Sequence, residues 1–359
     1  MDERNLAWLR IGRATLPESI KRVVLQHFPD PLEALSADLS VLPRQNRLRS
    51  GARLTLGGRS SERLVAQDVK WLASPGHSVI GLTDRKFPAL LREISCPPVV
   101  LYCKGDESLL QGPALAIVGS RNPTPAGVET AHDFASELAT IGIVVVSGLA
   151  LGIDSAAHRG ALKVRGPTIA ACATGLDIVY PRCHRDLAHQ ISEGGLVVSE
   201  FVLGTGVRRH HFPQRNRLIS GLSLGTLIVE AAPGSGSLIT AGFAADQGRE
   251  VFAVPGSINS PLSRGPHQLI RDGAQLVESA RQIVEHLSLS KEVQEIVKPA
   301  GKQPFWCTLA LDVVDFAPTS VNQVAQRSGL TISEVCAMLI RMELAGLVRS
   351  CAGGYLRLR

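Results

Sequence analysis

The sequence predicts an α/β protein whose centre is a parallel sheet, preceded by a helical region and followed by a small module of helices and a hairpin. Between residues 114 and 255 the chain repeats one unit: a short apolar run, a turn of small residues and an amphipathic stretch. This repeat is typical of a parallel sheet flanked by helices. Helical periodicity marks residues 1–75, and a polar stretch at residues 291–303 separates the last module.

The repeated unit predicts six strands with helices between them. The strands are expected at residues 114–118, 143–147, 168–173, 196–200, 225–229 and 250–254. The helices are expected at residues 127–140, 154–163, 184–192, 213–222 and 237–247. This domain is expected to span residues 76–290, entered through a strand, a loop and a second strand between residues 79 and 105. Cys172 lies inside an apolar run and is expected to be a small core residue.

Residues 1–75 are expected to form a small helical domain. Apolar side chains recur at helical spacing at Ile20, Val23, Val24 and Phe28, and prolines follow shortly after them. An unrelated helical cap is the alternative interpretation of this region.

Residues 304–359 are expected to form a winged helix. Helices are predicted at residues 309–316, 321–328 and 332–345, with Ser320 and Thr331 as N-caps and Gly346 as a stop. Strands at residues 347–350 and 355–358 would form the wing.

The third helix of this module carries few cations. A helix that contacts base edges needs cationic donors, but here Arg341 stands with Glu334 and Glu343. A protein-contact or accessory role is therefore favoured, and duplex binding is the alternative.

A cluster of cations precedes and enters the fourth predicted helix. Residues 208–217 read RRHHFPQRNR, which contains no acidic residue. Four fixed positive charges repel one another, so a phosphate-rich ligand is the expected counter-anion. Guanidinium groups match phosphate oxygens, and Phe212 offers a face on which a base can stack. The alternative is a solvated basic helix start that binds nothing.

Small turn residues follow five of the predicted strands. They are Gly119-Ser120-Arg121, Ser147-Gly148, Thr174-Gly175, Pro233-Gly234-Ser235-Gly236-Ser237 and Pro255-Gly256-Ser257. Ligands of open parallel sheets bind beyond the carboxyl ends of the strands, where glycine amides and helix N-termini favour phosphate. Neither GxxxxGK[ST] nor a GxGxxG after the first strand is present, so these turns do not indicate ATP or NAD.

Some polar residues near these turns are candidates for hydrogen bonds inside the protein and not for contacts with a ligand. Arg215 and Arg217 diverge by about 200 degrees on a helix, so one of them is expected to be structural, paired with an acid such as Glu230 or Glu200. The Asn216 amide is a candidate bridge from the loop to the sheet edge.

Two acidic residues near the turns, Asp154 and Glu230, are candidate catalytic groups. Asp154 and His158 share a helix face and suit a general base, but a structural N-terminal acid with a hydrogen-bonded histidine is favoured. Glu230 is expected to accept hydrogen bonds from loop amides. No catalytic residue and no metal site are predicted.

Bulk properties favour a cytoplasmic protein that binds a polyanion at a local site. The chain has 359 residues, a formal net charge of +6 and a pI near 9.1. Seven cysteines contain no CxxC pair. The N-terminus lacks a signal-type apolar core, and no apolar run reaches the length of a membrane span.

Motifs between residues 82 and 277 resemble the DNA-processing protein A family, also called DprA or Smf. They are Gly119-Ser120-Arg121, residues 147–154, Thr174-Gly175-Leu176-Asp177, Tyr180-Pro181, residues 212–217, residues 235–241 and residues 252–256. Thr124, Ala126 and His184 depart from the family pattern. The resemblance implies an extended Rossmann-like domain, a SAM-like N-terminal domain and a homodimer without cofactor. It also implies a cytoplasmic protein that binds incoming single-stranded DNA during natural transformation and helps to load the RecA recombinase onto it.

The combined hypothesis is a non-catalytic site for single-stranded DNA. Arginines would contact phosphates, loop amides would bind the same backbone and Phe212 would stack a base, which a paired helix does not allow. The predicted site residues are Gly119, Ser120, Arg121, Gly148, Thr174, Gly175, Arg208, Arg209, Phe212, Arg215, Asn216, Arg217, Ser235, Gly236 and Ser237. The alternatives are a nucleotide-processing hydrolase that uses Glu230 and an assembly scaffold without nucleic-acid affinity.

Overall fold

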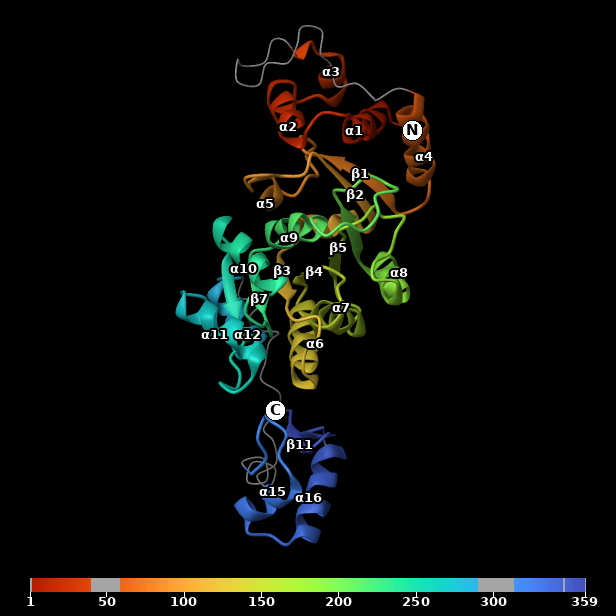
Figure 1. Cartoon of the computed structure of the whole chain (residues 1–359). Coiled ribbons are helices and arrows are strands. Elements are labelled where there is room, and N and C mark those ends of the chain that lie inside the picture. The colour runs from red at the N-terminus through yellow and green to blue at the C-terminus, as the bar shows by residue number, and fades with distance from the viewer. Residues whose placement is uncertain (1, 40–58, 290–312, 345, 359) are drawn as a thin grey trace. The chain divides into compact units, whose positions relative to one another are not determined.

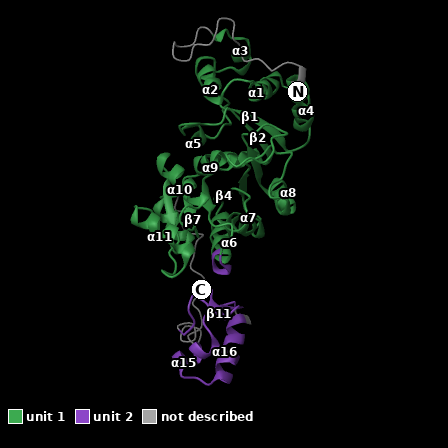
Figure 2. Cartoon of the chain, in the orientation of Figure 1, with its two compact units in different colours: residues 1–123, 128–294 green, residues 124–127, 295–359 purple. Residues whose placement is uncertain are grey.

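The computed structural model describes residues 2–39, 59–289, 313–344 and 346–358. They belong to two compact units, coloured separately in Figure 2: residues 1–123 with 128–294, and residues 124–127 with 295–359. The predicted linker at residues 291–303 lies outside the described residues.

A nine-stranded sheet forms the centre of the first unit, in the order β1-β2-β6-β5-β4-β3-β7-β8-β9 (Figure 1). The strands from β6 to β9 along this order are parallel, whereas β1 and β2 extend the sheet in antiparallel pairing. The strand order reverses between β3 and β7, which creates the switch point at which open sheets bind ligands. The strands are β1 (His77–Gly81), β2 (Val100–Gly105), β3 (Ala114–Val118), β4 (Val144–Ser147), β5 (Thr168–Ala171), β6 (Leu196–Ser199), β7 (Gly225–Ile228), β8 (Glu250–Ala253) and β9 (Gln275–Leu276).

The central strands are continuous apolar runs because helices cover both of their faces. Every residue of β3 to β7 is buried. The helices that alternate with these strands and follow them are α6 (Pro125–Thr140), α7 (Ile153–Lys163), α8 (Arg185–Gly194), α9 (His211–Gly221), α10 (Gly236–Asp246), α11 (Arg264–Arg271) and α12 (Ala280–His286). Short 3₁₀ turns lie at η3 (Glu107–Gln111), η4 (Arg182–His184) and η5 (Pro261–Ser263).

The predicted α/β fold and its six strands are confirmed, with ends that differ by one or two residues. Cys172 is buried, as expected. The sequence did not indicate β9, because its two exposed residues are too few to show a period. None of the described helices is long and apolar enough to cross a membrane.

The N-terminal helices pack on the antiparallel end of the sheet (Figure 1). Trp8, Leu9 and Ile11 belong to the same hydrophobic cluster as Leu101 and Tyr102 of β2. Helices α1 (Glu3–Arg13) and α4 (Arg59–Leu72) contact β1, and α1 also contacts β2. Helix α3 (Pro31–Ser36) packs on α1 and on α2 (Glu18–His27), and the short α5 (Ala89–Arg92), between β1 and β2, contacts α9. The domain boundary at residue 75 stays a prediction. Residues before and after this position belong to the same hydrophobic cluster.

The described residues 313–344 and 346–358 of the second unit hold two helices and a hairpin around their own apolar cluster. These elements are α15 (Val321–Ser328), α16 (Ile332–Leu344), β10 (Val348–Cys351) and β11 (Gly354–Arg357). Ser320 forms a capping box with Gln323, and Thr331 exchanges hydrogen bonds with Glu334, so both predicted N-caps are confirmed.

The helix predicted at residues 309–316 is wrong in the part that the structure describes. Residues 313–316 form a turn and a bend, and residues 309–312 lie outside the described ranges. The amide of Asp315 donates to the Thr319 hydroxyl at 3.0 Å, which replaces a helical backbone bond.

Two glycine-to-alanine substitutions are expected to change stability in opposite directions. At Gly81, a Cβ would overlap the indole of Trp8, which is fully buried. Gly81→Ala is therefore expected to lower the free energy of unfolding by about 1–3 kcal/mol. At Gly242, inside α10, a Cβ meets no atom within 4 Å, so Gly242→Ala is expected to raise it by up to about 1 kcal/mol. Urea unfolding of both variants measures the difference, and an unchanged midpoint for Gly81→Ala would contradict the packing argument.

Candidate nucleic-acid interface

In the turns at the carboxyl edge of the sheet, other parts of the protein pack closely against glycine residues. A Cβ on Gly148 would overlap the guanidinium of Arg215. A Cβ on Gly119 would lie 2.7 Å from the Ile153 side chain, and one on Gly175 would lie 2.6 Å from the Val202 carbonyl oxygen. These three glycines are therefore required by close packing, independently of any anion.

Several amides of the same turns already donate hydrogen bonds inside the protein. The Ser120 amide donates to the Glu230 carbonyl at 2.6 Å, and the Gly175 amide donates to the Thr205 carbonyl at 3.0 Å. The Gly148 amide donates to the Asp154 carboxylate at 3.1 Å. In this arrangement these amides are not available to a DNA backbone, so the expectation that they bind phosphate needs revision.

The turn before α10 is more open than the others. Ser235 is the N-cap of α10, and its hydroxyl lies 2.7 Å from the Ser237 hydroxyl. Gly236 is exposed, and a Cβ there would meet no atom within 4 Å. The Ser237 amide donates to the Ser235 hydroxyl at 3.3 Å.

Arg215 lies inside the protein, with 4% of its surface exposed. Its Nη1 donates to the carbonyl oxygens of Gly148 and Ala171, and its Nε donates to Asn216 Oδ1 at 3.2 Å. Burial lowers the pKa of this guanidinium from its ordinary value, and the negative charge of Asp154 opposes that change. Arg215 therefore ties α9 to the ends of β4 and β5.

Arg217 and Asn216 also have internal partners. Arg217 Nη2 lies 2.5 Å from Glu200 Oε2, and the two side chains are 12% and 6% exposed. The Asn216 amide donates to the Gly236 carbonyl at 3.2 Å. The predicted pairing of one of these arginines with Glu200 is confirmed for Arg217, and the structure makes Arg215 internal as well. Asn216 is internal as expected, but its amide joins α9 to the first residue of α10 and not a loop to the sheet edge.

The histidines of the basic run differ in exposure. His211 is buried, stacked on Phe201 with ring centroids 4.1 Å apart, and its Nδ1 lies 3.2 Å from the Ala173 carbonyl. His210 is exposed, like Arg208 and Arg209 before it. Among the described residues, no hydrogen bond or ion pair engages the side chains of Arg208 and Arg209.

Arg121, Phe212 and Tyr180 form a cationic and aromatic cluster in which Arg121 and Tyr180 are exposed and Phe212 is half-buried. The Arg121 guanidinium carbon lies 5.3 Å from the centre of the Phe212 ring, a cation–π distance. The Tyr180 ring lies 5.7 Å from the Phe212 ring, tilted by 57°. Tyr180 is 44% exposed. We name these three residues the stacking cluster.

The stacking cluster borders a small cavity of about 50 Å³ over the ends of β3, β4 and β5. Its lining residues are Arg121, Gly148, Ala150, Leu151, Ala173, Thr174, Tyr180, Pro181, Phe212 and Arg215. Predicted site residues from four separate segments thus meet here. Arg208 and Arg209 precede Phe212 in the chain and do not line the cavity.

Tyr180 was absent from the predicted site. Its signal in the sequence is the Tyr180-Pro181 dipeptide, which a cis peptide bond joins in the structure. The dipeptide marks a turn, but the contact with Phe212 joins positions 32 residues apart and leaves no local pattern.

The carboxylates near the cavity have structural partners. Asp154 accepts the amides of Gly148 and Ala150, as a helix N-terminal acid does. His158 Nδ1 lies 2.8 Å from the Thr168 hydroxyl, and burial lowers the pKa of His158 to about 3. These contacts favour the predicted structural role over a general-base pair.

Comparison with known proteins places the chain in a family. The model of DNA recombination-mediator protein A matches residues 78–288, and the model of the DprA winged helix domain matches residues 310–354. The Smf protein of Escherichia coli K12 is 41% identical over 310 residues, which cover 82% of this chain and 81% of the relative.

Two solved structures are similar to this chain over most of their own length. DNA processing protein A of Streptococcus pneumoniae aligns with a TM-score of 0.67 and 35% identity, covering 79% of this chain and 98% of that one. The Helicobacter pylori protein, whose structure is described for its unique single-stranded DNA binding mode, aligns with a TM-score of 0.54 and 33% identity over 59% of this chain and 95% of that one. With its fold, its carboxyl-edge turns and these matches, the chain belongs to the DNA recombination-mediator protein A family, also known as DprA or Smf.

Proposed function

We propose that this protein binds single-stranded DNA at the carboxyl edge of its sheet and delivers it to the RecA recombinase during natural transformation, without catalysing a reaction itself. It would act in the cytoplasm as a homodimer. The observation that carries this proposal is the stacking cluster, in which an exposed guanidinium lies over one of two adjacent aromatic rings. A base that stacks on an aromatic face must be unpaired, so the cluster favours a single strand.

The exposed arginines supply the electrostatic part of the proposed site. Arg121, Arg208 and Arg209 have exposed side chains, whereas Arg215 and Arg217 are engaged inside the protein. We therefore assign phosphate contact to the first three and a structural role to the other two. The Helicobacter pylori relative, described for its single-stranded DNA binding mode, supports single-stranded DNA as the ligand.

Removing one exposed arginine is expected to weaken DNA binding and to reduce its salt dependence. Three phosphate contacts predict a slope near −2 in a plot of log affinity against log salt, and each contact contributes about −0.7. Arg121→Ala, Arg208→Ala and Arg209→Ala should each weaken binding and lower the slope by about 0.7. Fluorescence anisotropy with labelled oligo-dT at several salt concentrations measures both quantities.

The matched control for these variants is Arg281→Ala. Arg281 is an exposed arginine on α12, paired with Glu285 one helical turn away. Its loss changes the net charge equally but should leave the slope and the affinity close to wild type. An equal effect of all four substitutions would show a non-specific charge effect and would count against the site.

Truncating Phe212 is expected to weaken binding without changing the salt dependence. Base stacking on an aromatic ring contributes about 1–3 kcal/mol, so Phe212→Ala should weaken binding by roughly fivefold to 150-fold. Phe212→Tyr keeps a ring and should retain most of the affinity. If Phe212→Ala instead reduced the salt slope as the arginine variants do, stacking would not be its contribution.

Delivery to RecA is expected to shorten the lag before RecA hydrolyses ATP on single-stranded DNA precoated with a single-strand-binding protein. The lag reports nucleation of the RecA filament. Wild type should shorten it, and Phe212→Ala should do so less at equal concentration, because it binds less DNA. An unchanged lag with wild type, on DNA that it demonstrably binds, would remove RecA delivery from the proposal and leave DNA binding in place.

A further inference from the structure

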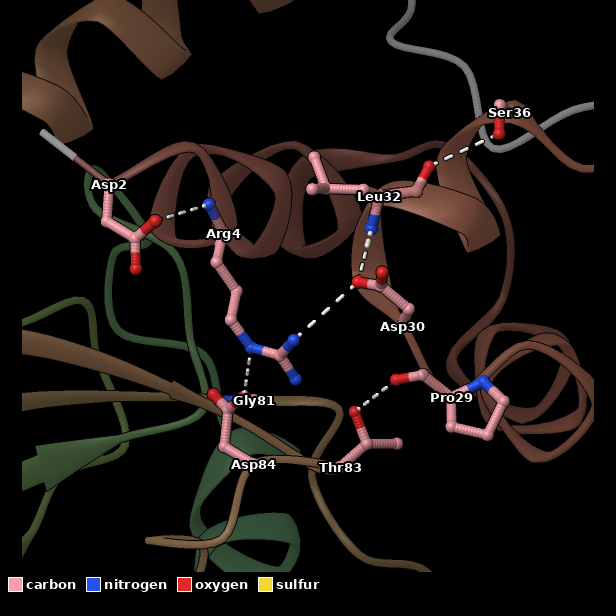
Figure 3. A network of polar contacts seen from close by, with 9 residues as sticks. All are labelled: Asp2, Arg4, Pro29, Asp30, Leu32, Ser36, Gly81, Thr83 and Asp84. Atoms are coloured by element: carbon pink, nitrogen blue, oxygen red, sulfur yellow. Dashed lines mark hydrogen bonds and ion pairs between the residues drawn. The ribbon is translucent and has the colours of Figure 1, made fainter.

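Helix α1 carries an arginine near each end that bonds to other segments of the first unit. Arg4, in the first turn, lies between Asp30 and Asp84 (Figure 3). Its Nε donates to Asp84 Oδ1 at 2.8 Å, and Asp84 stabilises the turn after β1 by accepting the Gly81 amide. Arg13, in the last turn, points to a different part of the molecule.

Arg13 makes three hydrogen bonds in a buried setting. Nε and Nη2 donate to the two carboxylate oxygens of Asp68 on α4, at 2.5 and 2.6 Å. Nη2 also donates to the carbonyl oxygen of Leu203 at 2.9 Å. The side chains of Arg13 and Asp68 are 7% and 0% exposed. Asp68 thus holds the guanidinium in one orientation, in which Nη2 donates its second hydrogen to the Leu203 carbonyl.

Leu203 lies in the segment that connects β6 to α9 and carries Arg208 and Arg209. We name residues 200–210 the arginine loop. Successive residues of this loop are attached to its surroundings: Gly204 donates its amide to Asp177 at 2.9 Å, and the Thr205 carbonyl accepts the Gly175 amide. Glu200 is fixed by Arg217. After Thr205 the loop is held again where it enters α9: the His211 side chain bonds the Gly206 backbone, and the His211 amide donates to the Arg208 carbonyl at 3.1 Å. The side chains of Arg208 and Arg209 are exposed.

We propose that Arg13 is a positioning residue for DNA binding: through Asp68 it fixes the Leu203 carbonyl, and thereby sets the conformation in which the arginine loop presents Arg208 and Arg209. This inference rests on the proposed single-stranded DNA binding. It gives the N-terminal helices a function in the site, although α1 supplies no residue that touches the cavity.

The geometry explains why an arginine is suited to this position. Its planar fork serves a carboxylate and a carbonyl at the same time, whereas the ammonium of a lysine lacks that fixed geometry. Without Arg13, the buried Leu203 carbonyl loses this donor and the loop gains conformations. If one loop residue is mobile in the free variant, DNA binding must order its backbone, and the lost conformational entropy weakens binding by roughly fivefold to thirtyfold.

The test compares the two arginines of α1 in the full-length protein. Arg13→Met is paired with Asp68→Leu, so that no buried carboxylate is left without its partner. Arg4→Met is the matched control, because it removes the polar contacts of the arginine at the other end of α1 and leaves the arginine loop untouched. Thermal unfolding of each variant establishes that it is folded at the temperature of the binding experiment.

Two measurements are made on each folded variant. Oligo-dT binding should be roughly fivefold to thirtyfold weaker for Arg13→Met/Asp68→Leu and near wild type for Arg4→Met. Backbone hydrogen exchange over residues 201–210, in the absence of DNA, should be faster in the first variant alone. A general loss of stability would instead accelerate exchange throughout the N-terminal helices and in both variants alike.

The outcomes separate this inference from the function on which it rests. Equal DNA affinity of the two variants, or unchanged exchange over residues 201–210 in Arg13→Met/Asp68→Leu, overturns the positioning role. Absence of DNA binding by the wild type overturns the proposed function, while the exchange result still decides whether Arg13 fixes the loop. If the double variant does not fold, Arg13→Lys, which keeps a charge beside Asp68, is measured in its place with the same criteria.

Discussion

The carboxyl edge of the sheet depends on one buried cation, Arg215. Its guanidinium joins the carbonyl at Gly148, after β4, to the carbonyl of Ala171, at the end of β5. Removing a guanidinium from water costs several kcal/mol, so the structure must offset that cost locally. Asp154 supplies a negative charge nearby and is itself held by the amides of Gly148 and Ala150.

This arrangement constrains the residues around it. Gly148 must be glycine, because any Cβ would occupy the space of the guanidinium. The N-terminus of α7 is fixed through Asp154, and α9 is fixed because it carries Arg215. Two strand ends and two helices are thereby held in one geometry, and Phe212 is presented one turn before Arg215 at the rim of the cavity.

The geometry of α9 divides the basic run into internal and external parts. Arg215 and Arg217 point in different directions on the helix, one toward the strand ends and the other toward Glu200, and both find acceptors. Arg208 and Arg209 precede the helix and remain exposed. A stretch that looks uniformly basic in the sequence therefore has two parts. The internal arginines Arg215 and Arg217 fix the local structure, and Arg208 and Arg209 are exposed beside it.

Features that depend on neighbouring residues could be predicted from the sequence, whereas features that depend on residues far apart in the chain could not. The central strands were predictable because burial on both faces gives each of them a continuous apolar run. Glycine residues marked the turns in the sequence, but the reason why glycine is needed lies far away in the chain. Gly148, for example, leaves space for the guanidinium of Arg215, which is 67 residues later. Amide donors were wrongly expected to be free, because a sequence does not show that the Glu230 carbonyl already accepts the Ser120 amide. Tyr180 was missed for the same reason, since its partner Phe212 is distant in sequence.

Buried ion pairs of this kind contribute more to geometry than to stability. Replacing such a pair by apolar side chains of similar volume is often neutral for stability, so their energetic contribution does not explain their use here. Arg13 and Arg215 both hold backbone carbonyls, one in a loop and the other at two strand ends, while Arg217 holds the side chain of Glu200, which follows β6. Apolar replacements would fill the space but would leave those backbone positions free to move. A site that recognises a flexible strand gains affinity when its own groups are ordered beforehand, because less conformational entropy is lost on binding. If the exposed arginines bind DNA as proposed, the internal arginines around them order that surface before the strand binds.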